Sequence, residues 1–126
     1  MWFQRDWRGP VTQDEKDRSE KIRDIPNLSG IYLIKSITTG AFYIGATINL
    51  HQRCRNHFRN LSKHFRHPLS FEYIKFGLDD LSVYILESDI PIKELKERET
   101  TWVFANKDNP LNRNSLSPAQ HRIWRS

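Results

Sequence analysis

The sequence contains a single cysteine and no hydrophobic run of membrane-spanning length. Cys54 cannot form a disulfide within this chain, which is typical of a protein from a reducing compartment. The first residues carry charges where a signal peptide would have an apolar stretch. We therefore expect a soluble, intracellular protein of the cytoplasm without membrane association. A chain of 126 residues is long enough for one domain with short tails.

Acidic residues are absent between Asp24 and Glu72, although the whole chain contains 15 of them. The basic residues of that window dominate the net charge of +5, and they are Lys35, Arg53, Arg55, Arg59, Lys63 and Arg66. Each Lys or Arg that neutralises a phosphate releases a condensed counterion, so a basic stretch of this purity favours a nucleic-acid surface. The alternative is a solvated basic helix without a partner.

Strand and helix patterns alternate along the chain. Residues 30–36 and 41–45 are β-branched and aromatic, and residues 37–40 supply a turn, so together they predict a β-hairpin. Periodicity and capping residues predict helices at 12–24, 49–66, 70–77 and 91–106, and a third strand at 81–88. This order predicts an α/β domain at residues 29–114, with a small three-stranded antiparallel sheet flanked by helices. A charged helical extension at 1–28 precedes it, and a basic tail at 115–126 follows.

Glu99 falls in the middle of an apolar stripe on the last predicted helix. The stripe is formed by Ile92, Leu95, Trp102 and Val103, which recur at helical spacing. A carboxylate in such a place needs a cation, a hydrogen-bonding partner or a metal ion beside it. A structural ion pair, for example with Arg53, is the alternative to a functional site.

The predicted hairpin and the helix at 49–66 bring further polar groups towards the core. A hairpin loop of two or four residues points Tyr32 and Tyr43 to the same face of the sheet. Arg53 and His57 flank the apolar arc of the helix. The opposite side of that helix carries Arg55, Arg59, Lys63 and Arg66, which we expect to contact DNA phosphates.

Two simpler interpretations of these residues stay open. Tyr32 and Tyr43 can be ordinary sheet aromatics, which is the more common role of strand tyrosines. His51, Cys54 and His57 share one face of the helix at 49–66, and that spacing allows a zinc site, although no fourth ligand is evident.

The tripeptides Gly30-Ile31-Tyr32 and Tyr43-Ile44-Gly45 resemble the two halves of the motif that names the GIY-YIG nuclease family. The resemblance covers about residues 29–114, and it continues through Arg53, His57, Glu99 and Asn112 in the family's order. That full set is a stronger signal than either tripeptide alone. The resemblance implies a GIY-YIG-like fold and a metal-dependent DNA endonuclease that hydrolyses phosphodiester bonds.

The resemblance also implies a role for each matched residue. Glu99 would be the sole protein ligand of a divalent cation, Mg²⁺ or Mn²⁺, and Arg53 would stabilise the charge of the transition state. Tyr32 would deprotonate or orient the attacking water, and His57 would assist by hydrogen bonding. Tyr43 would contact the phosphate or tune Tyr32, and Asn112 would fix the site by hydrogen bonds. Whether Tyr32 or His57 takes the proton stays open.

One such set of residues attacks one phosphate at a time. We therefore expect a nickase of double-stranded DNA, monomeric in solution and able to pair on DNA. Enzymes of homing or mobile elements, phage interference and restriction fit this description, so a phage or mobile element is a candidate source. The alternatives are a non-cleaving DNA-binding module of the same fold and a structure-specific DNA repair nuclease.

Overall fold

The computed structural model describes residues 22–60 and 67–114. Its strands β1 (Gly30–Ser36), β2 (Phe42–Thr47) and β3 (Leu81–Ser88) form one antiparallel sheet in the order β2-β1-β3. The helices are α2 (Leu50–Asn60), α3 (Ser70–Phe76) and α4 (Leu95–Ala105), and the short 3-10 turns are η1 (Ile22–Asp24), η2 (Leu78–Asp80) and η3 (Ile92–Glu94). The predicted α/β class and three-stranded antiparallel sheet are confirmed. The predicted helix at 12–24, apart from its last turn, and the end of the helix at 49–66 lie outside the described residues.

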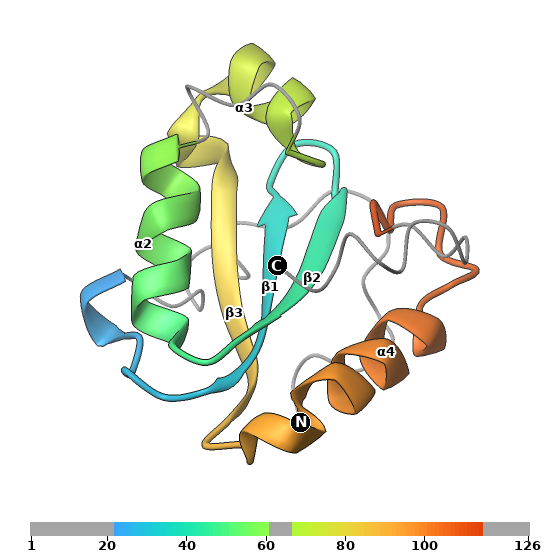
Figure 1. Ribbon diagram of the computed structural model, residues 1–126. Coiled ribbons are helices and arrows are strands. Elements are labelled where there is room, and N and C mark those ends of the chain that lie inside the picture. Colours follow the sequence, from blue (N-terminus) through green and yellow to red (C-terminus); the bar gives the residue numbers. More distant parts are fainter. Residues whose placement is uncertain (1–21, 61–66, 115–126) are drawn as a thin grey trace.

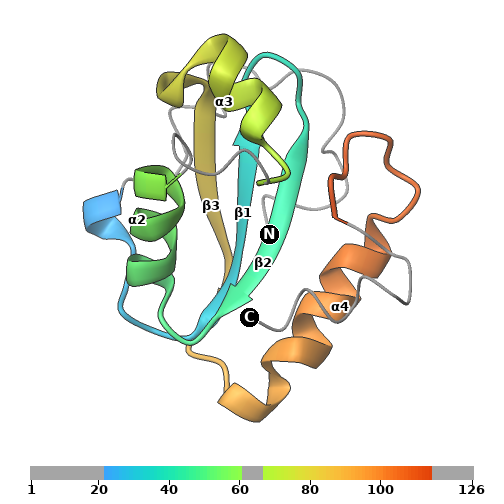
Figure 2. The same cartoon turned by 45° about the horizontal axis from the view of Figure 1, so that its top comes forward.

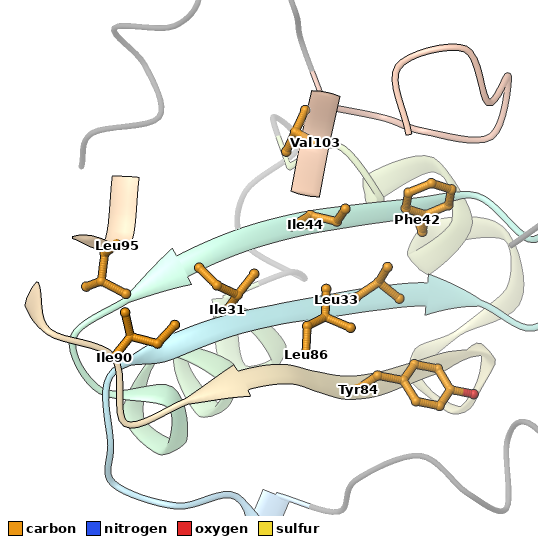
Figure 3. Packing of buried hydrophobic residues seen from close by; sticks show 9 residues of the cluster. All are labelled: Ile31, Leu33, Phe42, Ile44, Tyr84, Leu86, Ile90, Leu95 and Val103. Carbon is orange, nitrogen blue, oxygen red and sulfur yellow. The ribbon is translucent and has the colours of Figure 1, made fainter. Parts of the chain in front are cut away.

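The sheet forms a central layer with helices on both faces. Figures 1 and 2 show α2 and α4 on opposite sides of the three strands. On the α4 side, strand residues pack against Leu95 and Val103 (Figure 3), and these strand residues include Ile31, Leu33, Phe42, Ile44, Tyr84 and Leu86. On the α2 side, Leu50 and Cys54 are fully buried in a second apolar cluster. None of the described helices is long and apolar enough to cross a membrane.

The hairpin between β1 and β2 sets the register of the sheet. Ser36 N–H donates to the Ala41 carbonyl (2.8 Å), and Gly40 takes φ +81°, a conformation that favours glycine. This loop pairs Tyr32 with Gly45, and it pairs Ile34 with Tyr43. Because side chains alternate along each strand, Tyr32 and Tyr43 lie on the α2 face of the sheet, as predicted.

The helix termini follow their sequence signals, with one correction. Asn49 caps α2 by accepting the Gln52 N–H at its side-chain oxygen (3.1 Å), and Gly77 ends α3 with φ +88°. The prediction that Ile92 belongs to the buried stripe is wrong, because Ile92 lies in η3 and is 68% exposed. Pro91 opens this 3-10 turn, and α4 begins only at Leu95.

The outer edge of β2 is covered by the chain that follows β3. Phe42 N–H donates to the Leu111 carbonyl (2.9 Å), and Arg113 N–H donates to the Phe42 carbonyl (2.8 Å). Further along the same edge, the backbone N–H of Ala46 donates to the carboxylate of Glu99. An edge strand exposes unpaired backbone groups, so these contacts both protect the sheet and bring α4 to its rim.

Candidate active site

Tyr32 lies on β1 with its ring over the backbone of Gly45 on β2. A Cβ atom built at Gly45 would come within 2.3 Å of Tyr32 Oη and 2.4 Å of Cζ, so only glycine leaves room for this tyrosine. Tyr32 is 1% exposed, and burial raises the pKa of its hydroxyl well above the ordinary value. The phenol is therefore protonated at neutral pH in the protein without ligands.

Two histidines complete a cluster around the tyrosines. His57 Nε2 lies 2.6 Å from Tyr32 Oη, and His67 Nε2 lies 2.9 Å from His57 Nδ1. The Tyr43 ring stands edge-on to both imidazoles, with centroids 6.2 Å from His57 and 5.5 Å from His67. Burial lowers the pKa of His57 to about 3 and that of His67 to about 4, with the Arg53 charge adding to both shifts. Both imidazoles are neutral at pH 7.

Arg53 supplies the positive charge of this cluster. It lies one turn before His57 on α2 and is partly buried. Its charge lowers the pKa of both tyrosines and of Glu99, although burial outweighs it and all three pKa values are raised. The positive charge of Arg53 therefore lowers the pKa of both tyrosines, of Glu99 and of both histidines. An anion bound among these groups would be attracted to the same charge.

Glu99 reaches the cluster from α4, across the edge of β2. It is 4% exposed, and its hydrogen bond from Ala46 N–H lies one residue along β2 from Gly45, beneath the Tyr32 ring. Burial raises the pKa of Glu99 to about 7, against the opposing effects of Lys96, the Ala46 hydrogen bond and Arg53. Its charge in turn raises the pKa of Tyr32 and Tyr43. The structure thus brings together five of the six predicted site residues.

Asn112, the sixth, bonds within its own segment. Its amide donates to the Asn106 carbonyl (3.1 Å), and its side-chain oxygen accepts the Asn114 N–H (2.7 Å). Asn114 then pairs with both backbone groups of Ile44 on β2, at 2.9 and 2.8 Å. Asn112 therefore shapes the turn, and Asn114 makes the direct contact with the strand between Tyr43 and Gly45.

Sequence reasoning missed His67 and Asn114 as site residues. His67 was visible only as one of four histidines in the acid-free window, ten residues beyond His57. Asn114 lies two residues after Asn112, and the residues around it form no motif that would identify it as part of a site. Both act through contacts made where a loop returns to the sheet, which the local pattern does not encode.

The residues of the zinc interpretation are engaged elsewhere. His51 Nδ1 donates to the Ile25 carbonyl (3.0 Å), and Cys54 is fully buried in the core. Within residues 22–60 and 67–114, no three His, Cys, Asp or Glu side chains are grouped so that they could hold a metal ion. Among the described residues, Glu99 is the carboxylate whose charge acts on both Tyr32 and Tyr43.

The four residues predicted to bind DNA are described only in part. Arg55 is exposed on α2, on the side away from the core. Arg59 belongs to α2, but only its backbone is described, and Lys63 and Arg66 lie outside the described residues. The basic face therefore stays a prediction.

The family model of the GIY-YIG catalytic domain matches residues 28–112. The chain is also similar to UvrABC system protein C of two bacteria. It is 34% identical to the protein of Chlorobium chlorochromatii over 104 residues and 26% identical to that of Alkaliphilus oremlandii over 117 residues. These matches cover 76% and 87% of the chain, but only 16% and 18% of the relatives.

Two solved structures resemble the fold. The catalytic domain of the homing endonuclease I-TevI is 30% identical, with a TM-score of 0.57 over 69% of this chain and 99% of that domain. A mutant of the catalytic domain of the intron endonuclease I-TevI is 26% identical, with a TM-score of 0.56 over 71% of this chain and 98% of that one. The likeness spans nearly all of each of those domains.

Proposed function

The chain belongs to the GIY-YIG nuclease family, and from this membership and the site geometry we propose that it is a metal-dependent DNA endonuclease. The observation that carries the proposal is the gathering of Tyr32, Tyr43, Arg53, His57 and Glu99 around the Gly45 segment of β2. All five lie within the matched residues 28–112. Phenol, imidazole, guanidinium and carboxylate groups in one buried setting suit hydrolysis of a phosphodiester.

The donor set around Glu99 fits a hard divalent cation. Mg²⁺ and Mn²⁺ take one or two carboxylates, keep several waters and accept substrate phosphate oxygens, whereas structural zinc sites need four protein ligands. Glu99 is nearly buried on an apolar stripe, so its ionised form gains from a cation beside it. When bound, the cation would neutralise charge on the scissile phosphate. Glu99 is the protein residue that would hold it.

The remaining residues would position the phosphate and the attacking water. Arg53 provides a fixed positive charge for the phosphate oxygens, which gain charge in the transition state. Tyr32, hydrogen-bonded to His57, orients the attacking water, and Tyr43 lies beside it on the same face of the sheet. The water oxygen forms a bond to phosphorus while one ester P–O bond breaks, and the leaving oxygen departs as a hydroxyl with a proton that balances the one the water loses. The packing of the aromatic rings against one another and against the Gly45 backbone keeps these groups in place before DNA arrives.

Double-stranded DNA is the proposed substrate, and a nick in one strand is the proposed first product. The solved neighbours carry the name endonuclease, and the acid-free basic stretch supports a polyphosphate partner. One site holds one phosphate, and the two strands run antiparallel, so a second cut needs a second subunit or a rotation. We propose that the protein acts as a monomer on the first strand.

The test is incubation of the purified chain with supercoiled plasmid and Mg²⁺ or Mn²⁺, followed by separation of nicked, linear and intact DNA. Nicked circles should form first and require the metal. Glu99→Gln should lower cleavage by at least about 100-fold and leave DNA binding within a few-fold. Glu97→Gln, on an exposed position of the same helix, is the matched control and should cut normally.

Two results would contradict parts of this proposal. Binding of DNA without cleavage under either metal would identify a non-cleaving module instead. Linear DNA from the earliest time points, together with a dimer by ultracentrifugation, would show that paired sites act in concert.

A further inference from the structure

Building on the proposed function, we infer that His67 is a positioning residue that fixes the direction of the hydrogen bond between His57 and Tyr32. In this arrangement His57 donates to the Tyr32 oxygen and does not accept the Tyr32 proton. The inference rests on three consecutive contacts, from the backbone N–H of Leu69 through His67 and His57 to Tyr32.

The chain of contacts begins at a group that can only donate. Leu69 N–H lies 3.0 Å from His67 Nδ1 and donates to it, so Nδ1 carries no proton. His67 is neutral at pH 7, because burial lowers its pKa to about 4. A neutral imidazole has one N–H, and the proton of His67 is therefore on Nε2. His67 is held in place at the start of α3, where its carbonyl accepts the Ser70 N–H (2.9 Å).

The proton on His67 Nε2 decides the tautomer of His57. His67 Nε2 lies 2.9 Å from His57 Nδ1 and donates to it, so His57 Nδ1 is also bare. His57 is neutral as well, and its single proton is on Nε2, 2.6 Å from Tyr32 Oη. The hydroxyl oxygen of Tyr32 therefore accepts, and its own proton points away from His57 Nε2.

The opposite direction is blocked at the Leu69 end. If Tyr32 donated to His57, the proton of His57 would be on Nδ1, and His67 Nε2 would have to accept it. His67 would then carry its proton on Nδ1, facing the N–H of Leu69 at 3.0 Å. Two donors would meet, and a backbone amide cannot change its role.

This direction gives His57 a defined part in the proposed reaction. A donor aimed at the Tyr32 oxygen stabilises negative charge there, so His57 lowers the energetic cost of ionising Tyr32. The sequence left open whether Tyr32 or His57 takes the proton of the attacking water, and the three contacts exclude only that His57 accepts the proton of Tyr32. His67 acts through His57, and through Leu69 it ties the catalytic face of α2 to the start of α3.

The direct test is NMR of the full chain labelled with ¹⁵N-histidine, at pH 7 without DNA or metal. Long-range ¹H–¹⁵N correlation separates a protonated from a bare ring nitrogen, and the His57→Gln and His67→Gln variants assign the signals. We expect bare Nδ1 and protonated Nε2 in both residues. A protonated Nδ1 in His57 would overturn the inference whether or not the protein cuts DNA. If the expected pattern appears in a protein that never cuts DNA, the proposed function fails, but the inferred direction of the hydrogen bonds stands.

Three variants at His67 then separate hydrogen bonding from packing. His67→Gln keeps a donor at the place of Nε2, His67→Glu puts an acceptor there, and His67→Phe keeps the ring without either. We expect Gln to retain the His57 tautomer and cleavage within about threefold, and Glu to move the His57 proton to Nδ1. The His67→Glu and His67→Phe variants should each cleave DNA about tenfold more slowly or worse, which is the effect of losing about one hydrogen bond. Phe retaining activity while Gln loses it would show a packing role and overturn the inference.

Discussion

Replacing Glu99 by glutamine should make the metal-free protein more stable above neutral pH, although it removes the proposed metal ligand. Burial raises the pKa of Glu99 from 4.5 to about 7. The folded protein therefore keeps this proton between pH 4.5 and 7 while the unfolded chain releases it. Each pH unit in that window removes about 1.4 kcal/mol of stability, and the full effect above pH 7 is about 3 kcal/mol. Glutamine has no charge to desolvate, and its oxygen can still accept the Ala46 N–H.

The measurement is the free energy of unfolding in urea, from pH 4 to 9, with a chelator present. The informative quantity is the difference between wild type and Glu99→Gln at each pH. His57 and His67 have pKa values lowered to about 3 and 4, so both proteins lose stability as the pH falls below 6.5, and subtraction removes that effect.

The difference should grow in favour of the variant up to pH 7 and then level off. Glu97→Gln, which changes an exposed glutamate two residues away, should show no such trend. Adding Mg²⁺ at pH 8 should stabilise the wild type alone, because only its ionised carboxylate gains a partner. A difference that does not vary between pH 4.5 and 7 would refute the argument that Glu99 is a desolvated carboxylate.

Three further changes test the packing and the charges around the site. Gly45→Ala should lower stability by about 1–3 kcal/mol and abolish cleavage, because the new Cβ displaces the Tyr32 ring; thermal unfolding and plasmid nicking measure both effects. Arg113→Met should lower the free energy of unfolding by about 3–5 kcal/mol, because Arg113 pairs with the fully buried carboxylate of Glu72; a urea titration in which the variant matches wild type would contradict this. Arg55→Ala should weaken binding to all DNA sequences alike and reduce the slope of log K against log salt by about 0.9; an unchanged slope would place the DNA surface elsewhere.

The positions of the strands were predictable where the composition of the segment alone determines their end residues. Residues 30–36 and 81–88 are nearly continuous apolar runs, and the observed β1 and β3 have those same bounds. The second strand runs two residues past the predicted Gly45, because Ala46 and Thr47 pair with Ile31 and Gly30 of β1. Such an extension depends on the partner strand and not on the propensity of the residues themselves.

The candidate site was predictable to the extent that it depends on local periodicity. The hairpin register placed the two tyrosines on one face, and helical spacing placed Arg53 and His57 beside the core. Ile92 was misplaced because helical spacing was continued through a 3-10 turn, which rotates its residues away from the α-helical stripe. His67 could not be found in this way, since its role depends on where α3 begins relative to the end of α2.

Glu99 shows why a residue proposed to be functional can look out of place in a sequence. A leucine at this position would continue the stripe of Leu95 and Val103 and would remove the desolvated charge. It would also leave the N–H of Ala46 without its acceptor at the edge of β2, which costs about 1–3 kcal/mol. The two effects are of similar size, so stability alone gives little preference for either residue. The proposed function supplies the missing preference, since a cation beside Glu99 would turn this destabilised buried charge into the ligand of the proposed reaction.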